Sequence, residues 1–427
     1  MRIALGNPYC GPHVLEATQA FFENRSLVRC FASLVDFPTS PPFELLKKLL
    51  GLAFPKLQVA FSRRKFEGIP RELFRLYPWK EILRFLGRRM RLSPALIDQM
   101  WEWGDLSFDQ WMSKQLTSDM DAIYVYEHTS LETIKSAKSL GLVSFREQSS
   151  QHHKFFSKVL QRELERFPDL LNVYVRTYLS PKSKRRNYRR DQELEMTHYI
   201  VCNSSFTKRT LLSANIPDSK ILLVPLGFPE IKEASQETRE SRKPLVFLYA
   251  GTKSLRKGTH LLCQAWEKLK LKPSQAELWL VGGSELPRNF YSSVSNGIRW
   301  IPSVGPQALR ELYQKASVFV FPSLADGFGM VISEAMSVGL PVITTECTMG
   351  PDFIRHGKNG WIVPAGDSDV LADQMNWCVQ NRNRIPGFQE EALKIAKSRP
   401  WKCYREELVR VLTQKVQEIR ENQGPIH

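Results

Sequence analysis

Cysteine is scarce in this chain, and no two cysteines stand at the spacing of metal ligands. The 427 residues include seven cysteines, an odd number that is dispersed along the sequence. Such usage excludes the dense disulfide framework of small secreted domains. It is typical of reduced thiols in a cytosolic compartment.

Long apolar runs are also missing. No window approaches the uninterrupted apolar length that a membrane span needs. The first residues, MRIALGNPYCG, contain too short an apolar stretch for a secretory signal, because polar and turn residues follow at once. Tandem repeats and low-complexity tracts are absent from the sequence as well. We therefore expect a cytoplasmic protein.

The proportions of apolar and charged residues are typical of a folded protein, and the net charge indicates an anionic partner. Apolar residues make up 42% and charged residues 24%, and the formal net charge is +16. The length favours two cores rather than one. The charge favours a nucleotide, a nucleic acid or an anionic membrane surface as the partner.

Strand-like and helix-like segments alternate in both halves of the chain, which predicts an α/β fold with two Rossmann-like, doubly wound domains. Such domains bind ligands at the carboxyl ends of their strands, here in a central cleft that both halves face. The predicted parts are an N-terminal domain at 1–226 with a helical insertion at about 43–111, a polar linker at 227–244, a C-terminal domain at 245–400, and a C-terminal helix at 401–427 that packs back on the first domain.

The segment SLADGFGMVISEAMSVGLP (323–341) places two acids around a turn between a strand and a helix. Glycines 327 and 329 let the backbone pass close to a ligand, and the first amides of the helix form an anion site. We expect the amides of Gly329, Met330 and Val331 to face a phosphate. Glu334 is placed for ribose hydroxyls and Asp326 for a reacting group. The alternative is an acid at a helix start and a solvated glutamate.

Two further turns repeat this design. YAGTKSLRKG (249–258) has a strand, then Gly251, then basic residues before a helix, and Lys257 with Arg256 or Lys253 can neutralise a diphosphate. Gly350 follows the predicted strand PVITT at its carboxyl end. Three anion-binding turns after separate strands favour a nucleotide site over solvated loops.

These segments, together with GPDFIRHGKNGWIVPAGDSDVLADQM and SSFTKRTLL, resemble the retaining nucleotide-sugar glycosyltransferases of family 4, which have the GT-B fold. The resemblance covers roughly residues 195–400. It implies that Lys257 holds the diphosphate, Glu334 the ribose, and Asp326 the donor sugar. It further implies that the backbone at Gly329, Met330 and Val331 meets the phosphate or the sugar and that Gly350 shapes the sugar pocket. The segment WIPSVG (300–305) would lie against the base.

The chain departs from the family pattern in several places. The first acid of the E-x7-E motif is Asp326 instead of glutamate, and Thr252 stands where a basic residue is expected, so that Lys253 or Arg256 would substitute. The N-terminal glycine turn is only CGPH (10–13). Glu147 replaces the usual histidine at the end of an N-terminal-domain strand. His152 or His153 is the alternative group on the acceptor side.

Two D-x-D sequences, at 119–121 and 367–369, are interpreted without a metal, because Asp121 leads into a strand and Asp367 or Ser368 caps a helix. No cofactor and no metal are therefore expected. The donor would be linked to uridine or guanosine diphosphate.

Two segments concentrate the basic charge. Residues 63–92 interleave arginine and lysine with aromatic and aliphatic residues, as an interfacial helix on an anionic membrane does, and 182–190 (KSKRRNYRR) suits lipid phosphate, an acidic saccharide or nucleic acid. Solvated helix faces are the alternative for both. If these segments bind a membrane, the cytoplasmic protein would be peripheral on the inner face of that membrane.

The leading hypothesis is a hexosyltransferase of polysaccharide biosynthesis that moves a sugar from a nucleotide donor to a glycan or lipid-linked acceptor, with retention of anomeric configuration. The alternatives are a catalytically inactive GT-B scaffold and a basic nucleic-acid-binding protein. The latter explains the charge but not the Asp326 and Glu334 pair, and no nucleic acid partner is expected under the leading hypothesis.

Overall fold

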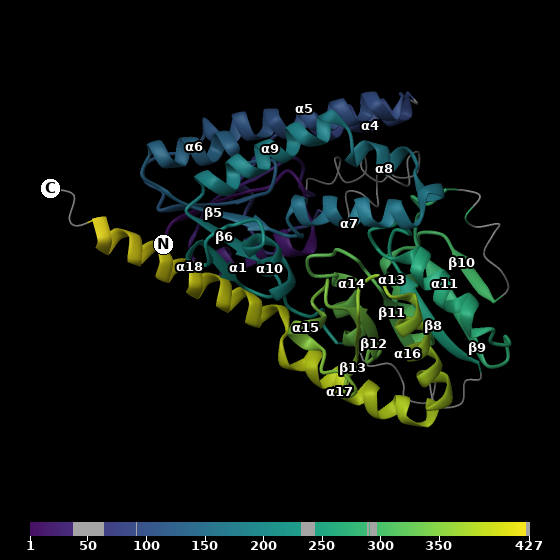
Figure 1. Cartoon of the computed structure of the whole chain (residues 1–427). Helices are drawn as coiled ribbons and strands as arrows, with labels where there is room; N and C mark the ends of the chain where they lie inside the picture. Colours follow the sequence, from purple (N-terminus) through teal and green to yellow (C-terminus); the bar gives the residue numbers. More distant parts are fainter. Residues whose placement is uncertain (37–63, 91, 232–243, 288–289, 291–296, 424–427) are drawn as a thin grey trace, which may run out of the picture. The chain divides into compact units, whose positions relative to one another are not determined.

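The chain forms two compact units in a computed structural model (Figure 1). The described residues are 1–36, 64–90, 92–231, 244–287, 290 and 297–423. The first unit comprises residues 1–148, 185–201 and 405–427, and the second comprises 149–184 and 202–404. These units are discontinuous in sequence, whereas the predicted domains are continuous segments, and the predicted domain boundaries stay a prediction.

A seven-stranded sheet has the order β3-β2-β1-β4-β5-β6-β7, with parallel pairing of β1 with β2 and β4, of β2 with β3, and of β4 with β5. Its strands are β1 (Ile3–Gly6), β2 (Leu27–Ala32), β3 (Phe74–Leu76), β4 (Ala122–Tyr126), β5 (Val143–Gln148), β6 (Tyr199–Cys202) and β7 (Ile221–Leu223). The helices of the first unit are α1 (Pro12–Glu23), α4 (Trp79–Arg89), α5 (Pro94–Ser113), α6 (Leu131–Ser139), most of α9 (Pro181–Met196) and most of α18 (Trp401–Gln423). Strands β4 and β5 are buried at every position, as parallel strands covered on both faces are.

The second unit contains a six-stranded parallel sheet with the order β10-β9-β8-β11-β12-β13. Its strands are β8 (Leu245–Ala250), β9 (Ala276–Val281), β10 (Ile298–Ile301), β11 (Val318–Phe321), β12 (Val342–Thr345) and β13 (Gly360–Val363). Its helices include α7 (His153–Arg166), α8 (Val173–Tyr178), α10 (Ser205–Leu212), α11 (Thr259–Leu269), α13 (Pro306–Lys315), α14 (Met330–Ser337), α15 (Gly350–Phe353), α16 (Ser368–Gln380) and α17 (Ile385–Ser398). The strand order reverses between β8 and β11, and a doubly wound sheet binds ligands at such a switch point.

Helix starts follow the capping residues that the sequence indicates. The Ser204 hydroxyl accepts a hydrogen bond from the Thr207 amide (3.0 Å) at the start of α10. The Asp367 carboxylate accepts from the amides of Asp369 (2.9 Å) and Val370 (3.0 Å) at the start of α16. The predicted capping role of Asp367 is therefore confirmed.

The predicted insertion at 43–111 is only partly described, since its residues 43–63 lie outside the described residues. The rest is not purely helical as expected, because β3 joins the sheet beside β2. Phe66 and Phe74 are buried and pack edge to face at 5.0 Å. Lys80 is buried in an ion pair with Asp105. These three side chains belong to the core of the first unit and not to an exposed basic and apolar face.

The linker predicted at 227–244 begins inside the packing of the second unit. The Phe228 amide donates to the Arg399 carbonyl (2.9 Å), and Phe228 is buried. A Cβ on Gly227 would stand 2.5 Å from the Cα of Trp401, so the chain crosses itself there. Residues 232–243 of the predicted linker lie outside the described residues.

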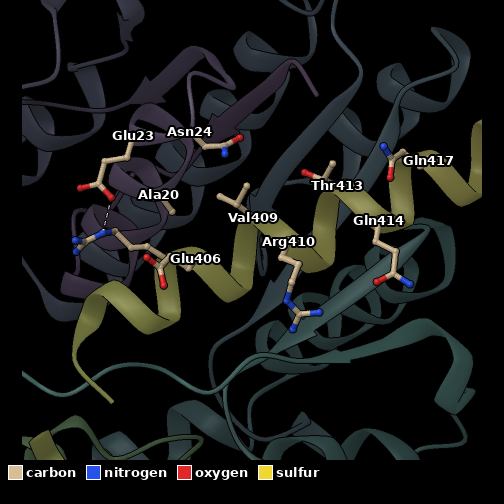
Figure 2. Close-up of a pocket in the computed structure, with 10 residues that line it drawn as sticks. Ala20, Glu23, Asn24, Glu406, Val409, Arg410, Thr413, Gln414 and Gln417 are labelled. Carbon is tan, nitrogen blue, oxygen red and sulfur yellow. Dashed lines mark hydrogen bonds and ion pairs between the residues drawn. The ribbon is translucent and has the colours of Figure 1, made fainter. Parts of the chain in front are cut away.

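The helix predicted at 401–427 is α18, which binds α1 within the first unit. Arg405 donates to Glu16 (2.6 Å) and Glu23 (2.9 Å). A groove of about 650 Å³ runs beside this contact, and Figure 2 shows Arg410 and Gln414 directed away from Glu23 and Asn24. Its polar side chains diverge rather than converge on one point. Over the described residues, none of the helices is both long enough and apolar enough to cross a membrane.

Buried charge is concentrated where β4 and β5 end in the first unit. Arg146 donates to Glu193 (3.1 Å), and Glu193 also accepts from the backbone amides of His128 (2.7 Å) and Ser130 (3.2 Å). The His128 ring is buried and stacks on Trp101 at 5.5 Å. Burial lowers the pKa of His128 to about 3, and nearby Arg190, Arg189, Arg186 and Lys80 lower it further.

The first unit is therefore expected to lose stability in acid through His128. An unfolded histidine has a pKa near 6.5, so the unfolded state binds more protons below that pH, and the stabilising contribution falls as pH drops toward 3. The loss between pH 7 and pH 5 amounts to about 2 kcal/mol. Urea titrations at the two pH values measure it.

The control is His128→Asn, because asparagine tolerates the left-handed backbone found here (φ +74°) and does not titrate. The variant should show a shallower pH dependence than the unaltered protein. Equal slopes would contradict the assignment.

Candidate functional site

Two loops meet at the switch point of the second unit: 251–258 after β8, and 322–329 after β11. Gly258 has φ +66°, and a Cβ there would collide with the Pro322 carbonyl oxygen. A Cβ on Gly282, after β9, would likewise collide with the carbonyl oxygen of Gly251. These glycines let three strand ends approach one another at backbone distance.

Lys257, Arg256 and Asp326 come together on these loops. The Lys257 ammonium donates to the Asp326 carboxylate, the Arg256 guanidinium lies 3.6 Å from the same carboxylate, and Arg256 also donates to the Ala325 carbonyl (2.8 Å). The side chains of Lys257 and Asp326 are 12% and 17% exposed. The sequence predicted all three residues for the site, and the fold brings them into one cluster.

The electrostatics of the cluster favour an anionic Asp326. Burial raises the pKa of Asp326, but Lys257 and Arg256 together bring it below its usual range. Burial lowers the pKa of Lys257, and Asp326 opposes that shift. Asp326 therefore carries a full negative charge at neutral pH beside two cations.

Glu334 lies on α14 and is held by Tyr313 of α13. The Tyr313 hydroxyl donates to the Glu334 carboxylate (3.1 Å). Burial raises the pKa of Glu334, whereas Tyr313 and Arg310 lower it in part. Glu334 is thus an oriented acceptor rather than a solvated mid-helix residue.

The remaining residues predicted for donor binding lie at strand ends and helix starts of the same unit. Gly329 (φ +76°) precedes α14, and the amides of Met330 and Val331 begin that helix, where amides have no intrahelical partner. Gly350 begins α15, and a Cβ there would stand 2.9 Å from Thr344 and 3.0 Å from the Thr345 carbonyl oxygen. Gly251 has φ +146°. Their roles stay predictions.

The sequence pattern does not predict two of the residues described here, Glu285 and Tyr313, as parts of the site. Glu285 follows β9, and burial raises its pKa while Arg256 and Lys257 lower it. Its position after a strand end, in LVGGSE, was the available signal. Tyr313 gave no such signal, because it sits in the last turn of an ordinary amphipathic helix.

The acceptor-side candidates fall in different units. Glu147 ends β5 in the first unit, where its buried carboxylate accepts from the Tyr124 hydroxyl (2.7 Å) and lies 4.0 Å from His13 Nε2. His13 opens α1 and is 24% exposed. The sequence pattern indicates a glycine turn at CGPH (10–13) but no role for His13. His152, in the second unit, caps α7 by accepting from the Lys154 amide (3.2 Å), and its own amide donates to Thr210 (3.0 Å).

The acids of the first D-x-D sequence have partners within the first unit. Asp119 accepts from Arg2, and Asp121 from the Arg2 amide and from Arg420.

Comparison with known proteins first gives a class for the second half of the chain. Residues 244–381 match the family model described as "Glycosyl transferases group 1". The matched segment contains Lys257, Asp326 and Glu334. The switch-point cluster therefore lies within the segment that this family model matches.

Individual relatives agree with that class. The amylovoran biosynthesis glycosyltransferase AmsK of Erwinia amylovora is 25% identical over 181 residues, which are 40% of this chain and 44% of the relative. The capsular polysaccharide biosynthesis glycosyltransferase CapM of Staphylococcus aureus is 26% identical over 200 residues, 43% of this chain and 53% of the relative. The chain spans about half the length of these curated relatives.

Solved structures match nearly the whole chain. HepE of Anabaena, in complex with UDP, has a TM-score of 0.62 at 15% identity and covers 97% of this chain and 100% of its own. Sucrose-phosphate synthase of Thermosynechococcus elongatus also has a TM-score of 0.62, at 16% identity, with 98% and 100% covered. The predicted GT-B fold is confirmed.

Removing the charge of Asp326 should destabilise the second unit. Asp326→Asn leaves Lys257 buried without its counter-charge, and breaking a buried ion pair costs about 3 kcal/mol. The double variant Lys257→Met/Asp326→Asn removes both charges and should regain most of that loss. Urea denaturation of the single and double variants measures this coupling. Additive losses would show that the two residues do not support each other.

Proposed function

We propose that the chain is a retaining family 4 glycosyltransferase that transfers a hexose from a nucleotide-diphosphate donor. The cluster of Lys257, Arg256 and Asp326 at the switch point, inside the matched domain, carries this proposal. Two cations, the start of α14 and a buried acid lie on loops of one unit, where a doubly wound sheet holds ligands. A scaffold protein has no need to bury these charges together.

The donor is uridine diphosphate-linked in this proposal. HepE is described in complexes with UDP and with UDP-glucose, and its fold is that of this chain. The Glu334 carboxylate, oriented by Tyr313, accepts ribose hydroxyls. The amides at the start of α14 bind the diphosphate.

The reaction places its developing charges beside these groups. Negative charge grows on the diphosphate as the glycosidic bond breaks, and Lys257 and Arg256 stabilise it. The anionic Asp326 accepts donor-sugar hydroxyls and stabilises the positive charge that develops on the sugar ring. Retention follows from the family resemblance, with attack on the same face as the departing diphosphate.

The acceptor is a glycan or a lipid-linked saccharide of polysaccharide biosynthesis. The names of AmsK and CapM support the process. On the first unit, His13 with Glu147 is the acceptor-side pair, because a partly exposed imidazole beside a buried carboxylate can bind an acceptor hydroxyl. The proposal favours this pair over a single acceptor group at Glu147, His152 or His153.

Turnover tests the proposal directly. Incubation with a panel of nucleotide sugars should release a nucleoside diphosphate, fastest from uridine donors. Glu334→Gln should weaken UDP binding by roughly 1.5–3 kcal/mol, because the ribose loses a charged acceptor. Calorimetric titration with UDP measures this.

Glu311→Gln is the matched control, since Glu311 is exposed on the neighbouring helix α13. It should bind UDP like the unaltered protein. UDP affinity that is the same in Glu334→Gln and Glu311→Gln would remove the ribose assignment, and a lack of release from every donor would remove the enzyme.

The first unit also has features of a membrane-facing surface. Trp79 (57% exposed) and Ile82 (42%) lie on α4, and Leu96 (46%) and Trp103 (48%) lie on α5, which runs beside α4 (Figure 1). Large apolar side chains at this exposure, in a chain of net charge +16, suit the headgroup region of an anionic membrane. Peripheral attachment to the inner face would give access to a lipid-linked acceptor.

Trp79→Ala should reduce flotation with vesicles that contain anionic lipid, and added salt should reduce it further, because each basic residue near the surface contributes about 1 kcal/mol. The control is Val370→Ala, an exposed apolar residue on α16 of the second unit. If the unaltered protein does not float even at low salt, the acceptor is a soluble glycan.

A further inference from the structure

A cavity of about 410 Å³ lies in the second unit, behind the loop that carries Asp326. Helices α7 and α10 and the ends of β11, β12 and β13 form its walls. Its lining residues are Phe155, Lys158, Val159, Arg162, Glu163, Phe206, Arg209, Thr210, Ser213, Leu324, Glu346, Cys347, Ala365 and Gly366. The volume is within the range of small-molecule sites.

Cations line this cavity from two helices. Arg162 and Lys158 come from α7, and neither has a hydrogen-bonded or ionic partner among the described residues. Arg209 comes from α10 and is held by the Glu346 carbonyl (2.7 Å) and the Ser205 hydroxyl (3.3 Å). Burial raises the pKa of the Cys347 thiol to about 12, Glu346 raises it as well, and Arg209 and Arg162 lower it.

The two acids that line the cavity do not neutralise all of the positive charge of the lining cations. Glu163 is paired with His260 (2.7 Å) and with Arg166 (3.0 Å), and Arg166 also donates to the Gly366 carbonyl. Glu346 is exposed and accepts from the Ala365 amide (3.0 Å). Three lining cations (Lys158, Arg162 and Arg209) thus stand against two lining carboxylates (Glu163 and Glu346), an excess of one positive charge, and Glu163 is already paired with Arg166 outside the lining.

The floor of the cavity is apolar. Phe206 and Cys347 are buried in one cluster with Ala325, and Phe155 packs edge to face on Phe206 at 5.2 Å. Leu324 is also buried. A ligand that fills this space has an apolar part against the phenylalanines and an anionic part against the arginines.

We propose that this cavity binds a phosphate monoester whose organic part is apolar or aromatic. Two guanidinium groups and an ammonium line the same cavity and match a dianionic phosphate, whereas a carboxylate would need only one of them. The site is separate from Lys257 and does not depend on the proposed glycosyl transfer.

Two contacts link the lining of the cavity to the Asp326 loop. The Asp326 amide donates to the Cys347 carbonyl (3.0 Å), and the Ala325 side chain packs in one cluster with the lining residues Phe206 and Cys347. A ligand in the cavity would therefore contact residues that hold the Asp326 loop in place, among them Cys347.

Phenyl phosphate is the probe, because it combines the two parts. Calorimetric titration should show tighter binding of phenyl phosphate than of inorganic phosphate, and Arg162→Gln should raise the Kd of phenyl phosphate at least fivefold. Arg162 is exposed and helical, so this change should leave the fold intact. Phe155→Leu should weaken phenyl phosphate but not inorganic phosphate.

Two controls locate the binding. Lys154→Gln removes a charge from the same helix outside the cavity, and Lys257→Met removes the cation of the donor loop. Neither should change the Kd of phenyl phosphate. Flotation with phosphatidate vesicles then separates two sources of the ligand: competition by phenyl phosphate indicates a lipid phosphate, and its absence indicates a soluble one. A Kd unchanged in Arg162→Gln, or raised only in Lys257→Met, would overturn the proposal.

Discussion

The close approach of backbone at the switch point of the second unit is the constraint on which the site depends. Gly258 lies against the Pro322 carbonyl, and Gly282 lies against that of Gly251. Side chains at these positions would separate the strand ends, and Lys257 would no longer reach Asp326. The ion pair therefore depends on glycines at these close approaches, one of which directly follows Lys257 in the chain. Once formed, it keeps an acid ionised and a lysine buried in the same place.

The sequence predicted the part of this site that local pattern encodes. Glycines after apolar strands, an acid before a helix and a lysine before the next helix are separated by fixed short distances, and the fold follows from their alternation. The clustering of Lys257, Arg256 and Asp326 was foreseeable because the carboxyl ends of parallel strands share one edge. The positions of Tyr313 beside Glu334 and of Glu285 near Lys257 could not be predicted, because they depend on tertiary packing and not on the spacing of residues in the sequence.

The region that sequence described least well is the basic, aromatic stretch after residue 63. Composition alone cannot separate a lysine that pairs inside a core from one that faces a membrane. Lys80 is the former, because Asp105 lies across from it on α5, twenty-five positions along the chain. Phe74 is likewise in a strand that the helical pattern concealed. Trp79, between them in sequence, remains exposed, so adjacent residues of one motif divide between core and surface.

The crossing at Gly227 brings together the two chain segments that flank the sheet of the second unit. Residue 228 enters beside 399–400, where Phe228 pairs with Pro400 and Arg399 donates to the carbonyls of Pro225 (2.5 Å) and Leu226 (3.3 Å). The sheet from β8 to β13 thus lies between two chain segments, 227–228 and 399–401, that contact each other. Exchange of this segment between relatives would have to preserve, besides this junction, the contacts of the segment with α7 and α10, such as His260 with Glu163 and the Glu346 carbonyl with Arg209.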